Sequence, residues 1–213
     1  MPDGLWESEK ESILASHGRP FFVAGVDEAG RGALAGPVVA ACVMFDPPVY
    51  RYKRLGIMDS KMLSPAKRER IYHSILENAK VVSVGYSSVE EIESFNIRQA
   101  TLLAMRRAVE SKLMASVSES TLLIAVDGKD CIPELILSQE TIVAGDRLVL
   151  SIAAASIVAK VSRDRFMDEL DRKFPAFHFR QHKGYGTLYH RQMIEKNGLS
   201  PFHRPLFCRN IWI

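Results

Sequence analysis

Strand-length apolar runs alternate with helical patterns along this chain, and that alternation limits the folds open to it. Residues 21–26 (FFVAGV) and 37–45 (PVVAACVMF) have the pattern of buried strands, and glycines punctuate the short segment between them. A hairpin is therefore predicted near the start of the chain. Further strands are predicted at residues 81–86, 122–126 and 141–144. Strands interleaved with helices indicate an α/β domain.

Helical spacing of apolar residues marks the segments between and after these strands. The first helix is predicted over residues 64–79, with a serine N-cap and proline in the first turn. Residues 151–174 predict a helix whose small residues would let it approach a sheet closely. Other helices are predicted at 89–114 and 188–196, before an irregular tail. With no linker or internal repeat, we expect one domain over residues 21–213 after a lead-in over 1–20.

Composition excludes several classes of protein. An apolar fraction of 47% and a charged fraction of 25% are typical of a soluble globular chain, and the net charge of +3 permits a polyanionic partner without indicating one. Cys42, Cys131 and Cys208 are far apart and lack metal-ligand spacing, so neither a disulfide scaffold nor a zinc site is predicted. The start lacks a secretory signal pattern, and no apolar run is long enough for a membrane helix. We therefore expect a cytoplasmic protein without a membrane partner.

Three aspartates share one feature of position. Asp27, Asp127 and Asp146 each lie at or just beyond the end of an apolar strand-like run, and Glu28 follows Asp27 directly. If those strands are neighbours, the carboxylates converge and repel one another unless a cation neutralises them. Any one of these acids alone is adequately explained as a strand-end or turn residue. As a set, they predict a catalytic cluster.

Oxygen ligands of this kind suit hard cations, so we expect Mg²⁺ or Mn²⁺ as the cofactor. Four carboxylates are enough for a two-ion site, in which one ion activates water and the other stabilises the leaving oxygen at phosphorus. Hydrolysis of a phosphodiester is the reaction that such a site favours.

The turn after the first acids is rich in glycine. Gly30 and Gly32 flank Arg31, which lets the backbone approach a ligand closely and present N–H groups to it. A dinucleotide-binding fingerprint is the competing interpretation. It is disfavoured because the spacing to Gly36 is one residue too long and a strand, not a helix, follows.

Several motifs then match one family in order along most of the chain. Residues 26–41 (VDEAGRGALAGPVVAA) closely resemble the signature of the ribonuclease HII family, the bacterial type 2 ribonucleases H. The other matching elements are Asp59-Ser60-Lys61 with Leu63-Ser64, Val126-Asp127-Gly128, Gly145-Asp146 followed by residues 151–164, and residues 182–187 (HKGYGT).

The resemblance implies a ribonuclease H-like fold, in which helices flank a central mixed sheet and a helical extension follows at the C-terminus. It implies Asp27, Glu28, Asp127 and Asp146 as the metal-binding catalytic acids. It also implies that the backbone of Gly30, Arg31 and Gly32, together with Tyr185, senses a ribose 2′-hydroxyl at an RNA–DNA junction, the group that distinguishes RNA from DNA. Alone, Tyr185 would be interpreted as an ordinary tyrosine held between glycines.

Basic residues offer candidate contacts to phosphates. We predict Lys61 and Lys183 as substrate contacts because both lie inside the matching motifs. Weaker candidates are Lys53, Arg54, Lys67, Arg68, Arg180 and Arg204.

Departures from the family pattern are small. Met62 replaces a usual lysine, and the tail around residues 203–207 only approximates the usual ending. The related ribonuclease HIII group usually has threonine at the position of Arg31.

The sequence thus predicts a metal-dependent endonuclease that hydrolyses the RNA strand of RNA–DNA hybrids and cuts 5′ of single ribonucleotides in duplex DNA. The resemblance implies 3′-hydroxyl and 5′-phosphate products and a monomer. Two alternatives stay open: a nuclease of this fold that acts on DNA alone, and a non-catalytic nucleic-acid-binding module.

Overall fold

A mixed β-sheet forms the centre of the protein. The computed structural model describes residues 22–47, 49–113 and 122–211, so the lead-in predicted over residues 1–20 lies outside the described residues. The sheet has the order β3-β2-β1-β4-β5. Pairing is antiparallel between β1, β2 and β3, and parallel between β1, β4 and β5. The strands are β1 (Phe22–Ala29), β2 (Val38–Met44), β3 (Val81–Ser87), β4 (Leu122–Asp127) and β5 (Gln139–Ile142).

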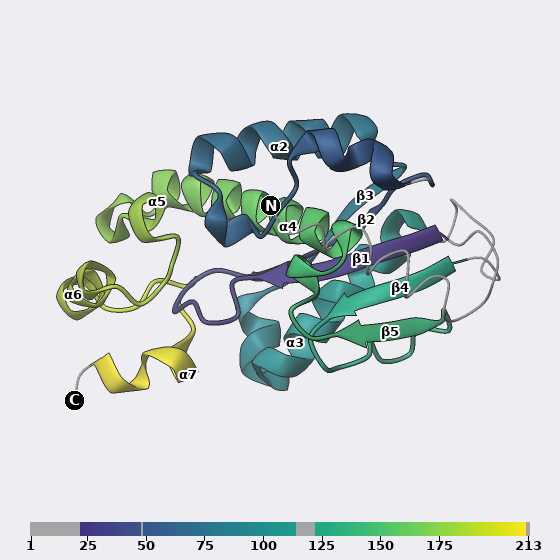
Figure 1. Cartoon of the computed structure of the whole chain (residues 1–213). Helices are drawn as coiled ribbons and strands as arrows, with labels where there is room; N and C mark the ends of the chain where they lie inside the picture. Colours follow the sequence, from purple (N-terminus) through teal and green to yellow (C-terminus); the bar gives the residue numbers. More distant parts are fainter. Residues whose placement is uncertain (1–21, 48, 114–121, 212–213) are drawn as a thin grey trace.

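Helices cover both faces of this sheet (Figure 1). One face packs against α3 (Val89–Lys112), and the other packs against α4 (Leu150–Lys173), which α2 (Pro65–Asn78) covers in turn. The C-terminal helices α5 (Phe179–His182), α6 (Leu188–Asn197) and α7 (Pro205–Cys208) gather beyond the sheet, near the end of α4. Short 3-10 turns complete the description: η1 (Val49–Leu55), η2 (Ser60–Met62), η5 (Gly145–Arg147), η6 (Pro175–Phe177) and η7 (Arg209–Ile211). These features confirm the predicted α/β class, the mixed sheet and the helical extension.

Local sequence signals account for the positions of α2 and α4. The Ser64 hydroxyl accepts a hydrogen bond from the Lys67 N–H and caps α2, which begins at the proline, as predicted. The first turn of α4 lies directly against β1. A Cβ added to Gly25 would come within 2.1 Å of the Ile152 nitrogen, so only glycine allows this approach. Because the helix here is built from small residues, it packs tightly on the sheet that carries the acids.

The long helix predicted over residues 89–114 is interrupted. Asn96 has φ 70° and ψ 163°, values outside the helical region, and the helix restarts after it. The side-chain oxygen of Asn96 accepts hydrogen bonds from the N–H groups of Arg98 and Gln99. Asparagine therefore acts as an internal N-cap, which apolar periodicity alone does not reveal. Met114, the predicted end, lies outside the described residues.

The fifth strand lies earlier in the chain than predicted. β5 is Gln139–Ile142 instead of residues 141–144, and Ala144 has a left-handed conformation with φ 57°. The Gln139 side chain bonds both the N–H and the C=O of Ile132, which fixes the strand start. The apolar run TIVA therefore includes the turn that follows the strand. None of the helices in the described ranges has the length and apolarity needed to cross a membrane.

Candidate active site

The sheet brings the predicted acids to one place. Val26 of β1 pairs with Val126 of β4 in the parallel ladder, so the following residues, Asp27 and Asp127, are level on neighbouring strands. Beyond β5 the chain turns through η5, which carries Asp146. Because parallel strands place their carboxyl ends at one edge, these acids converge there. Together with Glu28 they line a cavity of about 280 Å³.

Hydrogen bonds fix the orientation of two of these acids. The Glu28 N–H donates to Oδ1 of Asp27 over 2.7 Å, and the Gly145 N–H donates to Oδ1 of Asp127 over 2.7 Å. The second bond ties the turn that carries Asp146 to the end of β4. Asp27 and Asp146 are both only 6% exposed, so neither carboxylate is well hydrated. The cavity therefore concentrates negative charge in a poorly solvated setting.

Burial and mutual repulsion disfavour the charged forms of Asp27, Glu28 and Asp127. Burial raises the pKa of Asp27 well above its usual range, and the charges of Glu28 and Asp127 raise it further. Burial also raises the pKa of Glu28, although Arg31, at 3.3 Å from its carboxylate, acts against this. The pKa of Asp127 is raised by burial and by the charge of Asp146, despite hydrogen bonds that oppose the shift. A bound cation would relieve the unfavourable charge at all of these positions.

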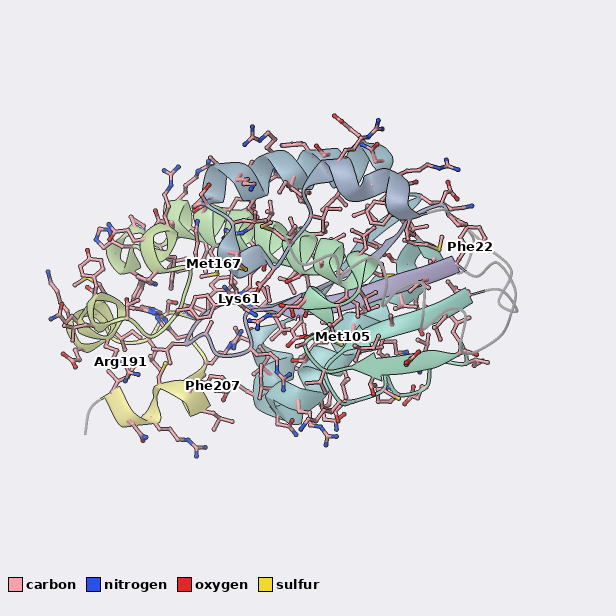
Figure 2. All side chains as sticks on the ribbon, viewed as in Figure 1. Phe22, Lys61, Met105, Met167, Arg191 and Phe207 are labelled. Atoms are coloured by element: carbon pink, nitrogen blue, oxygen red, sulfur yellow. The ribbon has the colours of Figure 1, made fainter. Side chains whose placement is uncertain are left out.

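Lys61 supplies one positive charge at the cavity. Its Nζ lies 3.5 Å from Oδ2 of Asp146, near the end of β1 (Figure 2). Partial desolvation acts to lower the pKa of Lys61, but the charges of Asp146, Asp59 and Asp27 outweigh it and raise the pKa. The buried carboxylate of Asp59 accepts from the Lys61 N–H, which orients the turn that carries this lysine. Lys61 is thus held at the acids while its side chain is 79% exposed.

The donor set fits a hard divalent cation. All four candidate ligands are carboxylates, and oxygen ligands of that kind suit Mg²⁺ or Mn²⁺. Within the described ranges, no three acidic, histidine or cysteine side chains are already arranged as ligands of one ion. Binding would therefore require small side-chain rotations that turn the carboxylates toward the ion.

The glycine turn and Tyr185 lie beside the acids. Gly30, Arg31 and Tyr185 line the same cavity, whereas Gly32 is exposed and does not line it. The two segments are joined through the backbone, because Ala33 forms an antiparallel bridge with Tyr185. Gly30 has φ +98°, a conformation that favours glycine. The structure thus brings together the two motifs that the resemblance assigns to ribose recognition.

A buried arginine holds these two segments in place. Arg163 of α4 is 0% exposed and donates hydrogen bonds to the carbonyls of Ala35, Pro37 and Lys183 over 2.8–3.1 Å. Its guanidinium carbon lies 5.2 Å from the centre of the Tyr185 ring. One side chain therefore clamps the end of the glycine turn to the loop that carries Tyr185.

Arg204 also holds the glycine turn in place, which is not the role predicted for it. It is fully buried, and it donates to the carbonyls of Gly36 and Arg31. The prediction that it offers its charge to a duplex is wrong, because no part of the side chain reaches solvent. Charge alone marked it as a surface residue, whereas unpaired turn carbonyls determine its position.

Lys183 lies away from the acids. Its ammonium pairs with Asp168 of α4, and its own carbonyl accepts from Arg163. The side chain does not line the cavity. Among the other positions, Asp164 forms an ion pair with Lys160 within α4 over 2.6 Å, as expected for a helical neighbour.

Three further polar residues that sequence reasoning did not select line the cavity, and Arg68, a weaker candidate, lines it as well. Ser60 and Ser156 share a hydrogen bond of 3.0 Å, and the Ser156 hydroxyl also bonds Asp27. Lys160, one turn after Ser156, lies 5.5 Å from the centre of the Tyr185 ring. Arg68 of α2 donates to the carbonyl of Ser60. The i, i+4 spacing of Ser156 and Lys160 was the available signal, since such residues share a helix face.

Comparisons with known proteins agree with this geometry. The family model described as Ribonuclease HII matches residues 24–210. A ribonuclease HII from Albidiferax ferrireducens is 49% identical over 188 residues, 87% of this chain and 86% of the relative. One from Synechococcus elongatus is 46% identical over 190 residues, 89% of this chain and 86% of the relative.

A solved structure shows the same fold. The ribonuclease H2 from Pyrococcus horikoshii is 26% identical and superposes with a TM-score of 0.67, covering 90% of this chain and 97% of that one. The predicted ribonuclease H-like fold is therefore confirmed. Since the family model spans nearly all of the sheet, all four acids and the Tyr185 loop, the chain belongs to the ribonuclease HII family.

Proposed function

We propose that this ribonuclease H cuts the phosphodiester on the 5′ side of a ribonucleotide embedded in duplex DNA, and also the RNA strand of RNA–DNA hybrids. The products are 3′-hydroxyl and 5′-phosphate ends. One observation carries the proposal: the four carboxylates, Gly30 and Arg31 of the glycine turn, and Tyr185 line a single cavity. Chemistry and ribose recognition are thereby available within the reach of one nucleotide.

The acids of the cavity bind the metal ions in this proposal. Asp27, Glu28, Asp127 and Asp146 hold divalent ions, Mg²⁺ or Mn²⁺, which would supply activation of water and stabilisation of the leaving oxygen. The raised pKa values of Asp27, Glu28 and Asp127 favour this, because a cation removes the repulsion that burial intensifies.

Recognition uses the backbone next to the acids. The N–H groups of the turn formed by Gly30, Arg31 and Gly32 bind the 2′-hydroxyl, and the Tyr185 ring packs on the adjacent sugar. Lys61 binds a backbone phosphate, which its 79% exposure permits. For Lys183 we propose only a contact at the edge of the substrate, since its ammonium pairs with Asp168.

The test is cleavage of a labelled duplex that contains one ribonucleotide, with Mg²⁺, with Mn²⁺ and with chelator, beside an all-DNA duplex and a long hybrid. We expect one cut 5′ of the ribonucleotide that chelator abolishes. Asp27→Asn should abolish it as well, while still binding the duplex. Equal cutting of the all-DNA duplex would favour a DNA nuclease, and metal-independent binding without any cut would favour a binding module.

The full chain acts as a monomer in the cytoplasm in this proposal, with nucleic acid as its partner. Light scattering at the concentration of the cleavage assay tests the first part. A mass of twice 23.9 kDa would contradict it.

A further inference from the structure

Three buried histidines lie under the Tyr185 loop, outside the carboxylate cavity. His190 is 0% exposed and His203 is 1% exposed, and their Nε2 atoms are 3.1 Å apart. The ring of His182 stacks on that of His190 with centroids 3.9 Å apart. None of these imidazole rings has a role in the metal binding or the substrate contacts proposed above.

Fixed donors and acceptors determine where each proton lies. The Ser200 N–H donates to Nδ1 of His203 over 2.8 Å, so this nitrogen carries no proton and Nε2 of a neutral ring must carry it. At the other end, Nδ1 of His190 lies 3.0 Å from the Tyr185 carbonyl oxygen, which can only accept. His190 therefore has its proton on Nδ1, and its Nε2 accepts from His203.

The chain of bonds thus runs in one direction, from the Ser200 N–H through His203 and His190 to the Tyr185 carbonyl. A second proton on either ring would place two donors face to face or oppose the Ser200 N–H. Burial lowers the pKa of His190 to about 3 and that of His203 to about 4, so both rings are neutral at pH 7. Each ring has one tautomer that satisfies all its partners.

The Tyr185 carbonyl is held from two sides. It accepts from the Thr187 backbone N–H over 2.8 Å as well as from the His190 ring. The Thr187 hydroxyl in turn accepts from the backbone N–H of His190. His190 lies in the first turn of α6, so the helix start, the imidazole and the loop form one unit.

We propose that His203 and His190 are positioning residues for junction recognition: their one-way hydrogen-bond chain fixes the Tyr185 backbone and so aims its ring at the sugar. This rests on the proposed function of Tyr185. Neither histidine touches the substrate in this proposal. The chain couples the C-terminal segment to selectivity between single ribonucleotides and long hybrids.

The protonation pattern can be tested without any substrate. Long-range proton–nitrogen NMR spectra of the full chain at pH 7 should show His190 protonated at Nδ1 and His203 protonated at Nε2. A His190 ring protonated at Nε2, or one that carries two protons, would overturn the hydrogen-bond chain directly.

Two substitutions at one position separate positioning from stability. Asparagine places its amide nitrogen where Nδ1 of histidine lies, and glutamine can place its amide oxygen near Nε2, where it accepts from His203. His190→Asn therefore keeps the bond to Tyr185 and loses the one to His203, whereas His190→Gln does the reverse. Each variant loses one buried hydrogen bond, so we expect similar decreases in melting temperature.

The preference for a single-ribonucleotide duplex over a long hybrid should distinguish the two variants. For His190→Gln we expect kcat/KM on a single-ribonucleotide duplex to fall about tenfold relative to a long hybrid, as for the loss of one hydrogen bond. His190→Asn should keep the ratio of the two kcat/KM values within about twofold of that of the unchanged protein. Equal shifts in both variants would mean that His190 only supports the fold.

Tyr185→Ala is the reference that keeps the two proposals apart. If this variant leaves the ratio unchanged, the proposed recognition by Tyr185 fails, and the histidine chain fails as a positioning device with it. If Tyr185→Ala shifts the ratio but His190→Gln does not, only the histidine proposal is refuted.

Discussion

Replacing Arg163 with methionine tests whether the recognition segments depend on a single buried side chain. Methionine fills similar space but donates no hydrogen bonds, so the carbonyls of Ala35, Pro37 and Lys183 lose their partner. Hydrogen bonds from a charged donor contribute roughly 1.5–3 kcal/mol each, which sets an upper limit near 5–9 kcal/mol. Removing a buried charge recovers part of that as desolvation energy. We expect a net loss of about 3–5 kcal/mol in the free energy of unfolding.

Urea unfolding followed by far-UV circular dichroism measures this loss, and Arg165→Met is the matched control. Arg165 lies half a turn further along α4, is 46% exposed and packs over Tyr72. Its loss should cost about 1 kcal/mol or less, because its exposed ion pair with Glu69 and its cation–π contact with Tyr72 are weak interactions. A loss below about 1 kcal/mol for Arg163→Met would refute the reasoning, since the three carbonyls would then be satisfied without it.

Three further outcomes are expected. Gly30→Ala should lower the unfolding free energy by about 2–4 kcal/mol, because Gly30 has φ +98° and the added methyl would lie 2.0 Å from Nε of Arg163. Gly32→Ala is the control and should change the unfolding free energy little, because no atom lies within 4 Å of the added methyl. In chelator, the melting temperature should fall as pH rises from about 4 through the raised carboxyl pKa values, because protonation favours the folded state there. The melting temperature of Asp27→Asn should fall less over the same pH range. Lys61→Met should reduce the slope of log Kd against log salt by about one in metal-free duplex binding, and an unchanged slope would exclude a phosphate contact.

The sequence predicted the parts of the site that follow from local periodicity. Asp27 and Asp127 follow apolar strand runs, and strands of that kind bring their carboxyl ends to one edge of a parallel pair. Ser64 was recognisable because an N-cap and a following proline form a short-range signal. In these cases the residues that determine the structure are neighbours in the chain.

Other parts depend on partners far away in the sequence. Arg163 and the turn carbonyls that it binds are separated by more than 120 residues, and Arg204 is separated from Gly36 by 168. No local pattern distinguishes such an arginine from a solvated one on a helix. The pairing of Lys183 with Asp168 likewise depends on how the loop folds back on α4. Sequence reasoning therefore offered Arg204 to the substrate, did not select Arg163, and predicted Lys183 as a substrate contact without its pairing to Asp168.

Helix α4 links the two halves of the site more directly than the sheet does. One face of it presents Ser156 and Lys160 to the cavity, and Arg163, less than one turn later, holds the glycine turn and the Tyr185 loop. Because α4 packs this closely on β1, which carries Asp27 and Glu28, it holds the recognition segments in a set position relative to these acids. On the proposed function, substitution of an acid should decide whether the enzyme cuts at all. Substitution of Arg163 should instead leave hydrolysis of long hybrids largely in place and weaken the choice of where a mixed strand is cut.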